Sequence, residues 1–222
     1  NEINENNLPA ELIPRYTTIE YALTRAAAGP PVFMWVVDTC MEERELESLR
    51  DSLEQVLQLL SASCPNALLG LITYGTVVQL HEIGFADCAK TYTFKGTKEL
   101  PSQQLADLLG LSTGAARGRQ AAPQGQPDTR SAAGRFLLPI SEAEFAISNV
   151  LSELKRDPWP VPGDARPQRC TGVAIATAVS LIEMAFPNCG ARTMLFCGGP
   201  CTIGPGQARA PLAPSRRECL WW

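Results

Sequence analysis

The sequence has only one histidine, His81, and aromatic residues make up only 7% of its 222 residues. A histidine that acts as a general base needs a nucleophile within hydrogen-bond reach. His81 lies beside Glu82 in a predicted hairpin strand, and no G-x-S-x-G motif supplies a nucleophile. We therefore interpret His81 as structural and predict no catalytic residue in the chain.

Long apolar runs and a strong excess of one charge are also missing. No stretch approaches the roughly 20 apolar residues that span a bilayer, and the first seven residues are acidic and polar rather than basic and then apolar. We therefore predict neither a membrane anchor nor a secretory signal. The formal charge of −4 gives no global attraction to nucleic acid. We predict no nucleic-acid partner, and any membrane contact must come from a local patch or a partner.

Repeated close pairs of cysteine, which structural zinc sites use, are absent. The nearest pair is the isolated Cys197-Gly-Gly-Pro-Cys201, and a lone pair cannot close a tetrahedral site. Buried, reduced thiols of a cytosolic protein explain such scattered cysteines best, so we predict no metal and no other cofactor. The eight cysteines are Cys40, Cys64, Cys88, Cys170, Cys189, Cys197, Cys201 and Cys219.

A phosphate-binding fingerprint is missing as well. Phe94-Lys-Gly-Thr-Lys98 lacks the glycine spacing of a phosphate loop, so we interpret it as a chance match. Residues 198–206 are rich in glycine, but their prolines remove amide donors that a phosphate cradle uses, which favours a structural loop. A doubly wound enzyme that binds a cofactor is therefore the weakest functional hypothesis.

What is present is the hydrophobic pattern of an α/β domain. Continuous apolar runs predict buried strands at 32–37, 68–74 and 192–197, and a hairpin partner at 77–83. Helical spacing predicts helices at 41–60, 141–155 and 172–186, with Phe145 on the apolar face of the second. Weaker patterns indicate an edge strand within 17–25, a short strand at 91–94 and a short helix at 101–109. This order predicts a doubly wound, mostly parallel sheet.

Changes in composition divide the chain into three predicted regions. Residues 1–30 form a lead with an edge strand, 31–206 form the core, and 207–222 form a divergent tail without helical or strand period. Within the core, residues 113–134 have scarcely any large apolar side chain, so we expect a disordered insertion. Because such a sheet normally has further strands, we expect the fold to be incomplete at its C-terminus and the natural chain to continue.

The segment Asp38-Thr-Cys-Met-Glu42 follows the first buried strand, where ligands of doubly wound sheets bind. It resembles the von Willebrand factor A fold, whose metal-binding version has Asp-x-Ser-x-Ser here and a later Asp. Cys40 and Glu42 replace the two hydroxyls, and no Asp follows the strand at 192–197. Since Mg²⁺ requires oxygen ligands, we predict a degenerate metal site at Asp38, Cys40 and Glu42, with Asp38 capping the next helix. A metal-dependent, ligand-binding A domain stays open as the alternative.

Several longer segments resemble one family, the GTPase-activating subunit of the COPII inner vesicle coat (the Sec twenty-three family). The resemblance extends over residues 7–206, and the Asp-Pro-Trp-Pro-Val-Pro motif that ends at Pro162 is its most specific part. The others are Pro9-Ala-Glu-Leu12, Val36-Val-Asp-Thr-Cys-Met-Glu42, Gly70-Leu-Ile-Thr-Tyr-Gly75, Phe94-Lys-Gly-Thr-Lys98, Leu108-Leu-Gly-Leu-Ser112, Gly198-Gly-Pro200 and Gly204-Pro-Gly206.

The resemblance implies a trunk region with a von Willebrand A-like core, in a coat that carries proteins from the endoplasmic reticulum to the Golgi. It implies four contacts: the cargo-selecting coat subunit, the small coat GTPase, the outer coat subunits and, through the coat, the endoplasmic reticulum membrane. It further implies a cytoplasmic protein, peripheral on that membrane and on COPII vesicles.

The family's zinc finger lies upstream of the matching segment. The arginine finger that activates the GTPase is expected in a later helical region, so no arginine here inherits that role. We therefore predict no enzymatic activity of the chain's own, and we expect Asp38 and Trp159 to serve folding.

Overall fold

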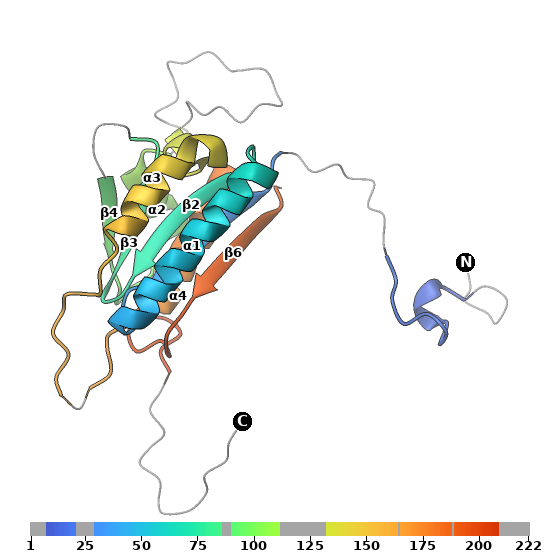
Figure 1. Ribbon diagram of the computed structural model, residues 1–222. Helices are drawn as coiled ribbons and strands as arrows, with labels where there is room; N and C mark the ends of the chain where they lie inside the picture. Colours follow the sequence, from blue (N-terminus) through green and yellow to red (C-terminus); the bar gives the residue numbers. More distant parts are fainter. Residues whose placement is uncertain are drawn as a thin grey trace, which may run out of the picture.

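The computed structural model describes residues 8–20, 29–85, 90–111, 132–163, 165–187 and 189–208. Its described strands form one mixed sheet in the order β4-β3-β2-β1-β6, with β5 pairing β2 off this path (Figure 1). The strands are β1 (Val32–Asp38), β2 (Leu68–Tyr74), β3 (Val77–Glu82), β4 (Lys90–Lys95), β5 (Leu138–Pro139) and β6 (Ala191–Phe196). Helices cover both faces, so the predicted doubly wound α/β fold is confirmed.

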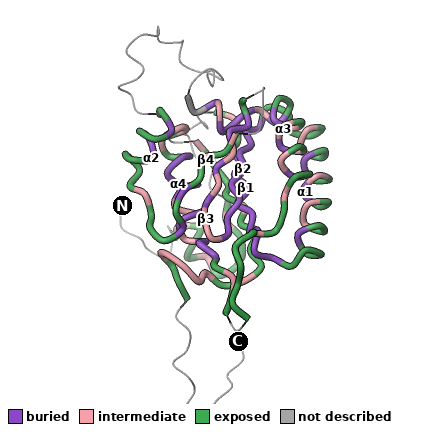
Figure 2. Tube along the Cα trace, turned by 90° about the vertical axis from the view of Figure 1, so that its left-hand side faces the viewer, coloured by how far each residue is buried: buried purple, intermediate pink, exposed green. Residues whose placement is uncertain are grey.

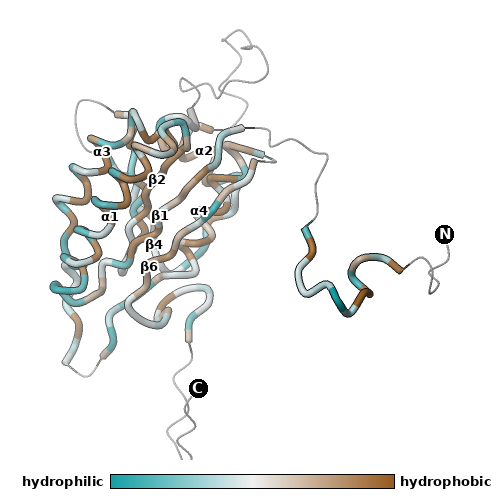
Figure 3. The backbone as a smooth tube through the Cα atoms, turned by 45° about the vertical axis from the view of Figure 1, so that its right-hand side comes forward, coloured by the Kyte–Doolittle hydropathy of each residue, from teal (hydrophilic) through white to brown (hydrophobic). Residues whose placement is uncertain are grey.

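The parallel part of the sheet consists of β6, β1 and β2. β1 lies in the middle, with Val36 opposite Ile72 of β2 and opposite Leu195 of β6. Every residue of β1 and β2 is buried, as continuous apolar runs predict, and these strands form the hydrophobic centre in Figure 3. β6, predicted as a third buried strand, is instead a largely exposed edge, because among the described strands it pairs only with β1.

The antiparallel part begins at the predicted hairpin, where β3 returns along β2 and β4 pairs β3. On the face toward α2 (Ser102–Leu109) and α4 (Thr171–Ala185), β3 and β4 bury Val78, Leu80 and Phe94. The two-residue strand β5 pairs Leu68 and Leu69 of β2, and the sequence pattern missed it because it is too short to show a period.

The opposite face carries α1 (Glu43–Ser63) and α3 (Ile140–Ser152), and Figure 2 shows the buried strands between the two helix pairs. Leu53 and Leu57 of α1 pack with Ile147 and Leu151 of α3 over β1 and β2. No helix among the described residues is long and apolar enough to cross a membrane.

Three sequence predictions require correction. Phe145 does not belong to the apolar face of α3, because its side chain is 78% exposed. Residues 17–20 form no strand, while 21–25 lie outside the described residues. Residues 113–131 of the predicted insertion also lie outside the described residues, while its last residues, 132–134, are not disordered, because they lie in the 3-10 helix η3 (Ala132–Arg135).

The N-terminal residues that the structure describes contain one short element, the 3-10 helix η1 (Ala10–Leu12). None of its residues is buried. It therefore adds nothing to the core that positions the site.

Candidate functional site

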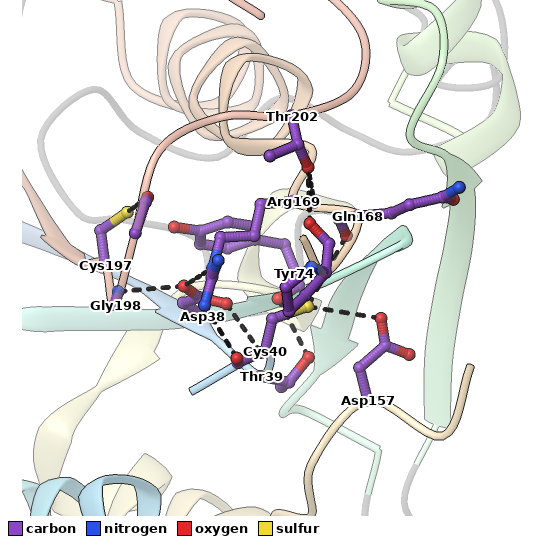
Figure 4. A network of polar contacts seen from close by, with 12 residues as sticks. Asp38, Thr39, Cys40, Tyr74, Asp157, Gln168, Arg169, Cys197, Gly198 and Thr202 are labelled. Atoms are coloured by element: carbon purple, nitrogen blue, oxygen red, sulfur yellow. Dashed lines mark hydrogen bonds and ion pairs between the residues drawn. The ribbon is translucent and has the colours of Figure 1, made fainter. Parts of the chain in front are cut away.

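The carboxyl ends of β1, β2 and β6 meet at one edge of the sheet, where a polar network joins them to the segment before α4 (Figure 4). Asp38 ends β1, and Gly198 lies just beyond β6. Arg169 enters from the segment that leads into α4. This is the edge at which doubly wound sheets bind ligands, so it is the candidate site of the fold.

The centre of the network is a buried ion pair between Asp38 and Arg169. The Arg169 Nε donates to Asp38 Oδ2 at 2.7 Å, and the side chains are 9% and 0% exposed for Arg169 and Asp38 respectively. Backbone N–H groups of Cys40 and Gly198 also donate to this carboxylate, at 2.7 Å and 3.0 Å. Arg169 Nη2 donates to the Cys40 carbonyl at 2.8 Å. The charge of Asp38 is therefore balanced and hydrogen-bonded inside the protein.

This pairing changes what the site can bind. An ionised carboxylate without a partner is very unfavourable in a protein interior, so a buried Asp needs either a metal ion or a cationic side chain. Here the Arg169 guanidinium supplies the positive charge at the carboxylate that a metal-binding A domain uses as a ligand. A divalent cation would have to displace that guanidinium and leave it buried without a partner.

Arg169 is held by the glycine-rich loop at 198–206. The Arg169 N–H donates to Thr202 Oγ1 at 2.8 Å, and the Thr202 N–H donates to the Arg169 carbonyl at 3.0 Å. A Cβ at Gly199 would lie 2.7 Å from the guanidinium, and one at Gly172 would overlap the Pro205 carbonyl. Gly204 has a φ of 79°, in the left-handed region that favours glycine. These contacts support the interpretation of 198–206 as a structural loop.

Asp157 fixes the loop between α3 and α4 to the same edge. Its Oδ2 accepts from the Thr76 N–H at 2.7 Å and from the Cys40 Sγ at 3.5 Å, and its own N–H donates to the Thr39 carbonyl at 2.9 Å. The neighbouring Trp159 side chain is 59% exposed, so it contributes little to the core and the expectation that it serves folding is not supported.

Two thiols and one phenol beside the network are held in their neutral forms. Burial, aided by the nearby charge of Asp38, raises the pKa of the Cys40 thiol to about 12, and burial raises the pKa of Cys170 to about 12. Burial also raises the pKa of Tyr74. Both thiols are therefore protonated at neutral pH, which leaves them poor nucleophiles and poor metal ligands.

His81 lies apart from the Asp38 network, on β3. Its Nε2 is 2.9 Å from Thr73 Oγ1 and its Nδ1 is 3.2 Å from Thr91 Oγ1. Burial lowers the pKa of His81 to about 4, so the ring is neutral at physiological pH. Two threonine hydroxyls therefore satisfy the imidazole, an arrangement that fits the predicted structural role.

The structure brings only two of the three predicted metal-site residues together. Asp38 and Cys40 share the network, whereas Glu42 is exposed at the start of α1. The predicted helix cap by Asp38 is wrong, because α1 begins at Glu43 and the Asp38 carboxylate is engaged by Arg169. The described residues contain no group of three His, Cys, Asp or Glu side chains suited to a metal ion.

The cysteines that the structure describes are all free thiols. Cys40 and Cys170 are buried, as predicted, but Cys64 and Cys197 are exposed and do not belong to the core. The key residue that the sequence did not identify is Arg169. A buried Asp after a strand signals that a cation is needed, but it does not say which arginine supplies it.

Comparison with known families matches residues 28–215 to the Sec23/Sec24 trunk domain. This range continues past Gly206 into the predicted divergent tail, and the three predicted region boundaries stay predictions. Among solved structures, the chain is similar to the crystal structure of the human COPII-coat protein Sec24c, with 14% identity and a TM-score of 0.49. The similarity covers 83% of this chain and 21% of that one. Because the family model matches most of its length, the chain belongs to the Sec23/Sec24 trunk domain family.

Proposed function

We propose that this trunk domain is a protein-interaction module of the COPII coat, which acts in transport from the endoplasmic reticulum to the Golgi. The observation that carries the proposal is the family match over residues 28–215. In this role the domain pairs with the cargo-selecting subunit and contributes to contacts with the small coat GTPase and the outer coat subunits. It thereby lies on the cytoplasmic side of the membrane without entering it.

The chemistry of the candidate site gives no support to a catalytic role. Asp38 is paired with Arg169, and the Cys40 thiol is protonated at neutral pH. The Asp-Pro-Trp-Pro-Val-Pro motif favours the GTPase-activating branch of the family over the cargo-selecting branch. GTPase activation then belongs to the full-length subunit, because the arginine finger is expected outside these residues.

A binding and rate experiment tests this proposal. The purified chain is titrated into recombinant cargo-selecting subunit, and GTP hydrolysis by the small coat GTPase is followed with and without the chain. We expect a complex to form and the hydrolysis rate to be unchanged, while the full-length activating subunit, as a control, accelerates hydrolysis by about 1,000-fold or more. Failure to bind the cargo-selecting subunit, under conditions where the full-length control binds, would contradict the proposal.

The alternative, a metal-dependent A domain, makes the opposite prediction for Mg²⁺. It requires heat of Mg²⁺ binding that disappears in Asp38→Ala. No observation in the structure favours it, because the required carboxylate is already neutralised by Arg169.

A further inference from the structure

A groove lies beside α3 on the face of the sheet that also carries α1. It is made of two hollows of about 410 Å³ and 640 Å³ that share His81, Val150 and Glu153 as lining residues. Its floor includes Gln79 and Thr91 on β3 and β4, and its wall is one side of α3. We call this feature the α3 groove. It starts at Asp157, near the strand-end network, and runs to Phe85.

The groove exists because, among the described helices, α2 and α4 cover β3 and β4 on one face and no helix fully covers the other. Val78, Leu80 and Phe94 point into the core beneath α2 and α4. The alternate residues point the other way, and Thr91 and Thr93 are exposed there. On this face, no described helix lies beyond α3 on the side toward β4, as Figures 1 and 2 show from two directions. The domain therefore presents an open strip of sheet beside a helix.

Apolar side chains border the groove at both ends. Phe145 on α3 is 78% exposed and Phe85 is 39% exposed at one end, and Trp159 is 59% exposed at the other. Exposed aromatic groups around a concave surface are typical of protein-binding sites, where large side chains supply most of the binding energy.

The charges of the groove are divided along its length. On the wall formed by α3 and the residues just after it, the exposed Glu142 and Glu153 form no ion pair with any described residue. Across from this wall, Glu82 pairs with two cations, with Lys90 Nζ at 2.9 Å and Arg135 Nε at 3.4 Å, so this cluster carries one net positive charge. Toward Trp159, Lys155 and Arg156 are exposed and lack ion-pair partners in the described part of the chain, while Asp157 is engaged by Thr76 and Cys40. The helix wall of the groove is therefore acidic, and its Trp159 end is basic.

We propose that the α3 groove binds an amphipathic helix of a partner protein. The apolar stripe of that helix covers Phe145 and Phe85, a basic side chain pairs Glu142 or Glu153, and an acidic side chain pairs Lys155 or Arg156. Charge complementarity fixes the direction of the helix, and the apolar contacts provide the affinity. The inference rests on the proposed function, because it names the surface through which the trunk domain engages a coat partner.

Binding to recombinant cargo-selecting subunit, measured by calorimetry, provides the test. Two variants change the groove without touching the core: Phe145→Ala, and the charge reversal Glu142→Lys with Glu153→Lys. The matched controls are Leu108→Ala, which removes a 59% exposed side chain on α2, and Glu47→Lys, which reverses an exposed charge on α1. Thermal unfolding of each variant verifies that it remains folded.

We expect each groove variant to bind about 10- to 100-fold more weakly and each control to bind within about 2-fold of the unchanged chain. Unchanged affinity in both groove variants would overturn the inference and leave the proposed function standing. If the unchanged chain fails to bind at all, both proposals are overturned.

Discussion

The two polar regions of this domain differ in where their polar groups find partners. At the strand ends, Asp38 is paired with Arg169, and Asp157 accepts hydrogen bonds from Thr76 and Cys40. In the α3 groove, Glu142 and Glu153 have no partner of opposite charge among the described residues. The first region lies where doubly wound folds usually bind ligands, yet the second is the one with groups free to bind.

This difference shows that position in a fold does not by itself make a site. The strand-end location predicts where a ligand of a doubly wound sheet would bind. In this chain Arg169 has taken over the role of the cation, and the network has become a structural support for the loops at that edge. Interaction chemistry is then expected on surfaces that the fold leaves open.

The largest loss of stability should follow removal of the guanidinium that neutralises Asp38 at the strand ends. Arg169→Met leaves the Asp38 carboxylate buried without a partner, so we expect the free energy of unfolding to fall by about 3–5 kcal/mol. Urea unfolding measures this change. Arg166→Met, which alters an exposed arginine three residues earlier, is the matched control and should change stability by less than about 0.5 kcal/mol. Equal losses of stability in the two variants would contradict the conclusion that Arg169 neutralises a buried carboxylate.

A smaller loss of stability is expected at low pH from the protonation of His81, on the floor of the α3 groove. Burial lowers its pKa from the ordinary value of 6.5 to about 4 in the folded protein, so the unfolded chain binds a proton first as the pH falls. The stabilisation is complete above pH 6.5 and is lost as the pH falls toward 4, by on the order of 2 kcal/mol. The unfolding free energies of the unchanged chain and of His81→Gln are compared between pH 7 and pH 4. The difference gives the share of the pH dependence of stability that comes from His81. Parallel pH profiles would show that His81 is not desolvated as described.

The smallest change of stability is expected for substitutions on the exposed face of β4. Thr93→Val keeps the shape of the side chain at an exposed position of β4, so we expect stability to change by less than about 0.5 kcal/mol. The reciprocal substitution Val78→Thr places a hydroxyl in the sealed core and should lower stability by about 1–3 kcal/mol. Thermal or urea unfolding compares the two. A larger loss for Thr93→Val would mean that this face is not open to solvent.

Much of the fold follows from hydrophobic periodicity in the sequence. The runs at 32–37 and 68–74 are buried on both faces and become β1 and β2 with nearly the same bounds. The helical spacing around Leu53 and Leu57 likewise predicts α1. These predictions succeed because a continuous apolar run or a helical repeat of this length is compatible with few other secondary structures.

The remaining errors concern contacts between residues far apart in the chain. The run at 192–197 looks like a central strand, but only the sheet order shows that β6 is an edge. Phe145 lies on the side of α3 opposite to the buried Ala143 and Ile147, two positions from each, so counting it with the apolar face overlooked its helical phase. Arg169 is separated from Asp38 by 131 positions, and nothing local to either residue marks the pair.

A double-mutant cycle on Asp38 and Arg169 tests most directly whether the strand-end site is closed by its own guanidinium. The unfolding free energies of Asp38→Asn, Arg169→Met and the double variant are measured against the unchanged chain. We expect the double variant to be more stable than the sum of the single effects predicts, by about 2 kcal/mol or more, because neither residue is then left as an unpaired buried charge. Additive effects, within about 0.5 kcal/mol, would contradict the pairing and leave Asp38 free to hold another cation.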